Sequence, residues 1–261
     1  MKKLLLLSAL LIFACSSDDS SNDDDNNNNN NSGLLNCDGN PIPSIVYGSQ
    51  EWTVENACHI TYRDGTPIPQ VIDNNQWANL TTGAWCYYDN DPNKGKLYNW
   101  YAVIGIHDND DSTPNKDFAP EGWHVPNNDQ FTTLINYLVD NGYESFQDET
   151  VDNTLAKSMA SATGWECDFP GTDTTYNSSG FNAFPISYRA GWSPTTSPNG
   201  LEGFFLPQGQ QTYFWCYEVA NWQGATDLYY STSLNIQCYL DSVQIGSSNK
   251  TSGLSVRLVK D

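Results

Sequence analysis

Residues 122–142 read GWHVPNNDQFTTLINYLVDNG, and this stretch decides how the middle of the chain folds. Pro126 is followed by Asn127 and Asn128, either of which can cap the first turn of a helix. Four apolar residues then recur at the i, i+3, i+4, i+7 spacing of one buried helix face: Phe131, Leu134, Ile135 and Leu138. Gly142 supplies the stop. The stretch predicts an amphipathic helix that packs on a core.

Around that helix, the chain reads as short extended segments broken by Gly, Pro, Asn and Asp. Weaker helix signals lie at 154–160 and at 75–79. Runs of aromatic and β-branched residues predict strands at 212–218, 228–233, 236–240 and 254–259. We expect these strands to form an antiparallel meander that ends in the C-terminal strand. No repeat of the length used by solenoids or propellers is present, so residues 37–261 are predicted to form one α+β domain.

The N-terminus, MKKLLLLSALLIFAC, has the order of a bacterial signal peptide. Two lysines precede an apolar run that is too short to span a bilayer as a permanent helix. The stretch 12–15 resembles the lipobox of bacterial lipoproteins. We therefore expect residues 1–14 to be cleaved and Cys15 to be acylated. The alternative is ordinary cleavage beside Ala14, which would leave Cys15 unmodified.

Residues 15–36 are predicted to be a flexible tether. No apolar residue occurs between Ser16 and Gly33, so this segment cannot bury enough surface to offset the entropy of ordering. Its acidic residues resemble the signal that exports lipoproteins of Bacteroidetes-type bacteria to the outer face of the outer membrane. A plain solvated spacer is the alternative. We expect a lipid-anchored protein of the outer membrane that faces the exterior and contacts the membrane through its lipid only.

The formal net charge of −20, with 31 acidic against 11 basic side chains, limits the partners. A chain this acidic is repelled by phosphate groups, so nucleic acid and anionic lipid head groups are excluded as partners. The acidity favours solubility and the attraction of cations.

Cysteine content predicts disulfides. The chain has 7 cysteines, and assigning Cys15 to lipid leaves an even number in an oxidising compartment. We predict that Cys216 pairs with Cys238, because both lie in strand-like segments whose Cβ atoms can come close if the strands are neighbours. The pairing of the other four stays open: Cys37, Cys58, Cys86 and Cys167.

The sequence contains no GxSxG, HExxH or GxxxxGK[ST] motif. Its three histidines are far apart and no CxxC pair occurs, so a transition-metal site is not indicated. A pair of carboxylates of the kind that cleaves glycosidic bonds stays open, because acids are abundant and their separation in space cannot be read from sequence.

Asp89, Asp91 and Asn93 are the candidate metal ligands, and no cofactor is expected apart from a calcium ion that these residues could bind. Their alternating oxygen-bearing side chains are of the type that calcium prefers. However, a twelve-residue calcium loop that starts at Asp89 would need glycine at Lys94 and glutamate at Trp100. An Asx-turn is the favoured alternative for the same residues.

Aromatic residues crowd the late strands and provide the candidate binding residues: Trp215, Tyr217, Trp222, Tyr229 and Tyr230. Exposed Trp and Tyr rings stack on sugar rings and anchor protein partners. These side chains therefore predict a contact face for a glycan or a cell-surface protein.

Several segments, in order, resemble the Fibrobacter succinogenes major paralogous domain, from about residue 45 to the end. They are QEWTVEN at 50–56, DGTPIP at 64–69, NQWA at 75–78, CYYDND at 86–91, GKLYNWYAV at 95–103, APEGWHVP at 119–126, SGFNAFP at 179–185 with Tyr188 and Arg189, and GLSVRLVKD at 253–261. Four tryptophans of these motifs are interpreted as packing residues: Trp52, Trp77, Trp100 and Trp123.

The GWHVP segment with its helix and the SVRLV segment near the end are also similar to formylglycine-generating sulfatase-modifying enzymes. This resemblance implies a C-type-lectin-like fold, in which terminal strands close an irregular antiparallel sheet and long loops form a surface. The chain departs from both patterns: Leu258 stands where the family often has a cysteine, and the cysteine pair that those enzymes need near the terminus is missing.

The lack of catalytic motifs, the lipid tether and the lectin-like resemblance favour a noncatalytic surface module for binding or adhesion. The alternatives are a carboxylate-based hydrolase, a divergent formylglycine-generating-type oxidase, and a purely structural envelope protein. A fold alone does not choose among them.

Overall fold

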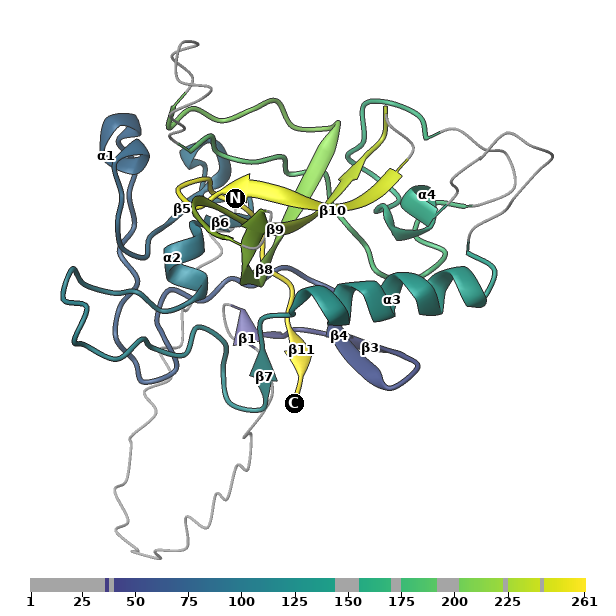
Figure 1. The fold of residues 1–261 in the computed structure, drawn as a ribbon. Helices are drawn as coiled ribbons and strands as arrows, with labels where there is room; N and C mark the ends of the chain where they lie inside the picture. Colours follow the sequence, from purple (N-terminus) through teal and green to yellow (C-terminus); the bar gives the residue numbers. More distant parts are fainter. Residues whose placement is uncertain are drawn as a thin grey trace, which may run out of the picture. The chain divides into compact units, whose positions relative to one another are not determined.

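A computed structural model describes residues 36–37, 40–143, 155–169, 175–191, 202–222, 225–239 and 242–261. The chain divides into two units, Met1–Asn31 and Ser32–Asp261, and every described residue belongs to the second. The predicted signal peptide and Cys15 lie outside the described residues. The second unit combines helices with several small antiparallel sheets (Figure 1), as expected for the α+β class.

A four-stranded antiparallel sheet joins segments from both ends of this unit. Strands β3 (Ser44–Tyr47) and β4 (Gln50–Thr53) form a hairpin. Strand β11 (Val259–Lys260) lies between β4 and β7 (Trp123–His124), as Figure 1 shows. Val259 pairs with Trp52 on one side and with His124 on the other. This pairing brings Asp261 next to His124.

The predicted meander is present as a three-stranded antiparallel sheet in the order β10-β9-β8. Its strands are β8 (Gln211–Trp222), β9 (Ala225–Gln237) and β10 (Ser242–Asn249). Strand β9 is continuous where the sequence predicted two strands, because Leu234 and Ile236 continue the buried apolar face. Strand β10 was not predicted, because its sequence SVQIGSSN is rich in residues with low strand propensity.

The predicted strand at 254–259 does not end the meander. Only β11 is regular there, and it belongs to the four-stranded sheet. Leu254 and Ser255 make isolated bridges with Tyr98 and Phe214. The apolar side chains of this segment are all buried, so it runs through the core instead of forming a half-exposed strand.

The remaining elements are short. Strands β1 (Asn36–Cys37) and β2 (Asn40–Pro41) pair with each other, as do β5 (Trp85–Tyr87) and β6 (Lys96–Tyr98). The helices are α1 (Asn74–Ala78), α2 (Trp100–Val103), α3 (Asn128–Asp140) and α4 (Leu155–Met159), with a 3-10 turn η1 (Tyr88–Asn90). The structure confirms the two weaker helix predictions as α1 and α4.

Helix α3 forms as the sequence predicts. Asn127 caps it, and Gln130 completes a capping box. Phe131, Leu134 and Leu138 are fully buried, while Ile135 is half-buried against the same core. The chain leaves the helix through Gly142, whose φ of 80° lies in the left-handed region.

The predicted disulfide between Cys216 and Cys238 is wrong. Cys238 is bonded to Cys167, with the two Cα atoms 6.0 Å apart. The strands β8 and β9 do pair, but their antiparallel register places Cys238 just past one end of the ladder and Cys216 near the middle of β8. The backbone N–H of Cys238 donates to the carbonyl of Gln210, at the start of β8, whereas Cys216 lies beyond the Trp215–Ser233 pair.

Oxidation of the cysteines is therefore only partial. Cys58 is also disulfide-bonded, but Cys86 and Cys216 are free thiols and both are buried. Cys37 belongs to β1, and its side chain lies outside the described part of the chain.

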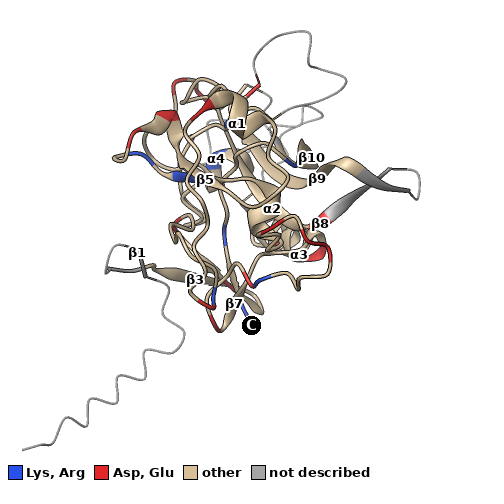
Figure 2. Ribbon diagram, turned by 90° about the vertical axis from the view of Figure 1, so that its left-hand side faces the viewer, with Lys and Arg blue, Asp and Glu red and all other residues tan. Residues whose placement is uncertain are grey.

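Charge is distributed unevenly between surface and core. Figure 2 shows acidic residues spread over several loops and few basic residues beside them. Two of the basic side chains, Arg189 and Arg257, are fully buried. The few cations of this acidic chain thus serve partly to build its interior.

Candidate functional site

A pocket of about 390 Å³ opens beside the first turn of α3. We call it the His124 pocket. It is bounded by the loop at 115–119, the end of α2, strand β7, the start of α3 and strand β8, through Arg63, Val103, Ile104, Asn115, Lys116, Asp117, Phe118, Ala119, His124, Val125, Asn127, Gln130 and Tyr217.

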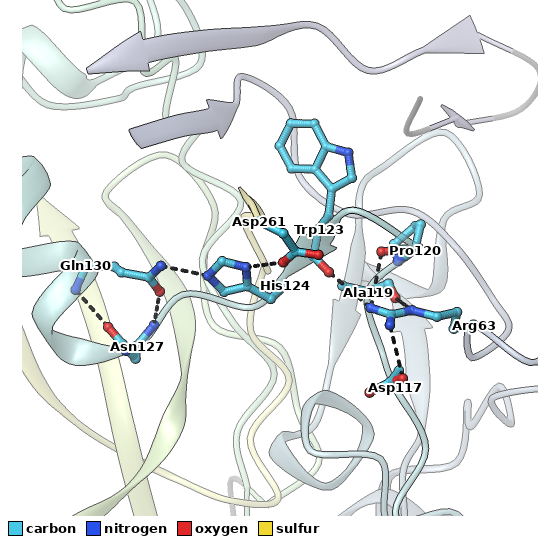
Figure 3. A network of polar contacts seen from close by, with 9 residues as sticks. All are labelled: Arg63, Asp117, Ala119, Pro120, Trp123, His124, Asn127, Gln130 and Asp261. Atoms are coloured by element: carbon cyan, nitrogen blue, oxygen red, sulfur yellow. Dashed lines mark hydrogen bonds and ion pairs between the residues drawn. The ribbon is translucent and has the colours of Figure 1, made fainter. Parts of the chain in front are cut away.

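His124 lies at the centre of a polar network in this pocket (Figure 3). Its Nδ1 atom lies 2.7 Å from Oδ1 of Asp261, and its Nε2 atom lies 2.6 Å from Nε2 of Gln130. Asp261 is within reach because β11 pairs beside β7. The imidazole therefore links the end of β11 to the first turn of α3.

The capping box of α3 determines which atom of Gln130 faces the imidazole. Oε1 of Gln130 accepts from the backbone N–H of Asn127 at 2.9 Å, and Oδ1 of Asn127 accepts from the backbone N–H of Gln130 at 2.8 Å. Because a backbone N–H can only donate, Nε2 of Gln130 must point at His124. A neutral His124 then accepts at Nε2 and donates from Nδ1 to Asp261.

Arg63 lies on the other side of the network, where its donors are used within one loop. Nε donates to the carbonyl of Ala119 at 2.8 Å, and Nη2 donates to the carbonyl of Trp123 at 3.1 Å. Nη1 forms an ion pair with Asp117 at 3.1 Å. These contacts hold the loop before β7 in place. The carboxylate of Asp117 balances the positive charge of Arg63.

A second ion pair borders the pocket. Nζ of Lys116 lies 2.5 Å from Oδ2 of Asp64. Hydrogen bonds from Lys116 and from Thr66 lower the pKa of Asp64 well below its usual range. The carboxylate is therefore ionised at every physiological pH and stays paired with Lys116.

The floor of the pocket is apolar, and one wall carries an exposed ring. Val103, Phe118 and Val125 belong to the core beneath the pocket. Tyr217 on β8 is 53% exposed, and its backbone N–H donates to the carbonyl of Pro126 at 2.9 Å. This bond fixes β8 beside the start of α3, so the ring of Tyr217 is presented at the pocket by a rigid strand.

The five predicted aromatic residues do not form one face. Trp215 is fully buried, and its Nε1 donates to the carbonyl of Tyr98 at 2.7 Å, so it is a core residue. Tyr217 lines the His124 pocket, and Tyr230 lines a different one. Tyr229 is exposed. Trp222 ends β8, and its side chain lies outside the described part of the chain.

The candidate calcium residues are held by contacts within their own loop. Oδ1 of Asp91 accepts from the backbone N–H of Asn93 at 3.0 Å and from its side-chain Nδ2 at 2.9 Å, which is the Asx-turn of the alternative interpretation. Asp89 pairs with Lys94 at 3.2 Å. Across the described residues, no three His, Cys, Asp or Glu side chains are grouped so that they could hold a metal ion.

Sequence reasoning missed most of the polar network. The capping-box pattern from Asn127 to Gln130 is a local signal that could have identified Gln130. The contact between His124 and Asp261 spans 137 positions, and no local pattern indicates it. Arg63 was missed for the same reason, since its partners come from a distant loop.

The comparisons with known proteins give one match. The sequence model of the Fibrobacter succinogenes major domain matches residues 45–260, which include every residue of the His124 pocket. No curated protein and no solved structure shows significant similarity to the chain.

Proposed function

The chain belongs to the Fibrobacter succinogenes major domain family, and we propose that it is a noncatalytic surface module that binds a glycan or a protein partner through the His124 pocket. The observation that carries this proposal is the pairing of the pocket's polar groups with one another beside an exposed tyrosine ring. Such a site is preorganised for recognition, because its side chains need not be ordered when a ligand binds.

The state of His124 favours binding over acid–base catalysis. An imidazole beside a carboxylate is a common catalytic pair, but a general base needs a free nitrogen lone pair to take a proton. Here the Nε2 lone pair faces the amide of Gln130, and the carboxylate of Asp117 is paired with Arg63. These pairings argue against the hydrolase alternative at this pocket.

The free thiols argue against the oxidase alternative. A reactive cysteine is an accessible thiolate. Burial raises the pKa of both Cys86 and Cys216 to about 12, and neither side chain is exposed. Both thiols are therefore protonated and shielded at neutral pH, as expected for core residues.

We further propose a C-type-lectin-like arrangement for the domain. Two features support this arrangement. The early hairpin β3–β4 and the last strand β11 lie in one sheet, and long irregular loops connect the regular elements. This support concerns the fold, and a shared fold does not by itself assign a ligand.

For the location of the protein, we propose a lipid anchor at Cys15 in the outer membrane, with the domain facing the exterior. The described helices are all too short and too polar to cross a membrane. Several acyl chains on one cysteine would bury enough methylene groups for stable anchoring.

The proposal is tested by probing a glycan array with the labelled full chain and by cross-linking the protein on intact cells. Tyr217→Ala should abolish the bound signal, because it removes the exposed ring of the pocket. Tyr239→Ala is the matched control, because Tyr239 is equally exposed at 56% but does not line the pocket. Equal loss in both variants, or binding that survives Tyr217→Ala, would contradict the proposal.

A further inference from the structure

A second pocket, of about 250 Å³, is built by the meander and the loop that precedes residue 192. We call it the Tyr230 pocket. It shares no residue with the His124 pocket. Its walls carry Tyr188, Tyr213 and Tyr230 together with hydroxyl and amide side chains that include Ser247 and Asn249.

The Tyr230 pocket is electrically neutral in a strongly acidic protein. None of the described residues that line it is Asp, Glu, Lys, Arg or His, although the chain as a whole carries a net charge of −20. A charged ligand would find no counter-charge inside this pocket, and an anion would also be repelled by the rest of the surface. The lining therefore favours an uncharged ligand.

Two of the three aromatic rings, those of Tyr188 and Tyr213, are held in fixed positions. Tyr188 and Tyr213 pack edge to face with their centroids 5.0 Å apart. The hydroxyl of Tyr213 accepts from Nε2 of Gln237 at 2.8 Å and donates to Oε1 of Gln211 at 3.1 Å. Rings fixed in this way offer flat apolar faces without a cost in side-chain entropy.

Two buried acceptors next to Tyr213 have no partner. Oδ1 of Asn235 and Oε1 of Gln237 make no hydrogen bond, although their side chains are only 8% and 7% exposed. Asn235 pairs with Tyr213 across the strands, and Gln237 binds its hydroxyl. Neither Asn235 nor Gln237 lines the Tyr230 pocket, so these acceptors belong to the interior behind Tyr213 and do not themselves contact a ligand there.

The pocket also offers a hydrogen-bond donor. Oδ1 of Asn249 accepts from the backbone N–H and the hydroxyl of Thr251 at 2.9 and 2.7 Å. This arrangement orients the side-chain amide of Asn249, and its Nδ2 group is then the atom that can donate a hydrogen bond to a ligand. The hydroxyl of Ser247, on the same strand, can donate or accept.

We infer that the Tyr230 pocket binds one neutral sugar unit of a glycan. A sugar ring presents an apolar C–H face to an aromatic ring and hydroxyl groups to amides and serines, which is the chemistry of this lining. The volume of about 250 Å³ is slightly below the range of about 300–1,000 Å³ that drug-sized ligands occupy, so it suits a single sugar unit. The inference rests on the proposed function in one respect, which is that the protein binds glycans. It does not depend on the His124 pocket, because the two pockets share no residue.

The test uses an array of neutral and anionic glycans probed with the labelled full chain, followed by calorimetry with the neutral oligosaccharide that gives the strongest signal. We expect binding to neutral glycans that Tyr230→Ala weakens at least tenfold. Tyr229→Ala is the matched control, because Tyr229 is the neighbouring residue and is exposed but does not line the pocket. Thermal unfolding of each variant shows whether the fold is retained.

Three outcomes would overturn the inference. They are no binding to any neutral glycan, binding to anionic glycans only, and an equal effect of Tyr230→Ala and Tyr229→Ala in folded protein. If Tyr217→Ala abolishes glycan binding while Tyr230→Ala does not, the proposed function stands and this inference fails. If Tyr230→Ala abolishes glycan binding while Tyr217→Ala does not, this inference stands and binding of the glycan by the His124 pocket is contradicted.

Discussion

Arg257 donates a hydrogen bond from Nε to Oδ1 of Asn56 at 2.7 Å, across 201 positions of sequence. Its Nη1 donates to the carbonyls of Thr53 and Phe181, and its Nη2 donates to the carbonyl of Asn182. Among the described residues, no carboxylate forms an ion pair with this buried guanidinium, and carbonyl and amide oxygens accept its hydrogen bonds.

Arg189 is built in the same way. It donates to the carbonyls of Val71, Ile72 and Gly203 and to Oδ1 of Asn74. Each guanidinium also lies over two aromatic rings, with Arg189 4.5 Å from the centroid of Trp77 and Arg257 4.7 Å from that of Phe181. Two arginines thus connect irregular loops that regular strand pairing does not hold.

Replacing Arg257 with methionine should destabilise the protein by about 3–5 kcal/mol, because four acceptors, of which the carbonyls of Thr53 and Phe181 are buried, lose their donor together. Urea unfolding measures the loss. Lys260→Met, three residues further on, removes a partly exposed ion pair with Glu51 and a contact of the ammonium group with the ring of Trp123, and should cost only about 1 kcal/mol. Similar costs for the two variants would show that Arg257 is dispensable for the core.

The half-buried side chain of His59, whose Nε2 atom is shielded from solvent, predicts a loss of stability in mild acid. Burial is the main cause that lowers its pKa to about 4, from an ordinary value of 6.5. Between these values the unfolded chain binds more protons than the folded protein, so stability decreases as the pH falls from 6.5 toward 4. The full effect is about 3 kcal/mol.

The pH prediction is checked by urea unfolding of the wild type and His59→Asn between pH 4 and pH 7. Asparagine keeps a side-chain donor near the backbone of Phe118 but cannot titrate. The free-energy difference between the two proteins should therefore change with pH across this window. A constant difference would mean that His59 does not contribute to the pH dependence.

Leu134→Ala should cost about 2–5 kcal/mol, as expected for a large-to-small change in a packed core. Leu134 is fully buried on α3. Asn136→Ala, two positions away on the exposed face of the same helix, is the control and should change the free energy of unfolding by less than about 0.5 kcal/mol. Comparable values for both variants would place Leu134 outside the core.

Helix α3 could be predicted because all its signals are local: a cap, a spacing of apolar residues and a stop. Strand β10 could not, because its stability comes from pairing with β9 and not from its own Ser-rich sequence. The His124 pocket combines residues from segments that are far apart in the sequence. Tyr217 was among the predicted binding residues and His124 lies in the GWHVP motif, but no local pattern indicates that the two line one pocket. The error at Cys216 has a different origin: the neighbouring strands were expected, but sequence does not give the register that separates the two cysteines.

Cys15→Ser should release the protein from the membrane fraction, because the signal-peptide order ends at this cysteine and acylation would be lost. Cell fractionation measures the release, and mass spectrometry of the wild-type N-terminal peptide identifies the lipid. An unmodified N-terminus at Cys15, or full membrane retention of the variant, would count against the anchor.

The cysteines should show two distinct behaviours on alkylation. Cys86 and Cys216 are fully buried and their pKa is raised to about 12, so iodoacetamide should label them only after denaturation. Peptide mapping without reduction should recover Cys167 linked to Cys238. Labelling of Cys216 in the native protein would show an accessible thiol and would reopen the oxidase alternative.

Loss of the bond between Cys167 and Cys238 should also be costly. The bond closes a loop of 71 residues, for which the entropic model gives about 4 kcal/mol of stabilisation. The double variant Cys167→Ser/Cys238→Ser should therefore unfold at a much lower urea concentration than the wild type. Cys216→Ala is the control, since it removes a buried thiol without opening any loop. If the double variant and the control are equally stable, the bond does not stabilise the protein by restricting the unfolded chain. The packing of Cys238 in the hydrophobic core would then be enough to hold it in place.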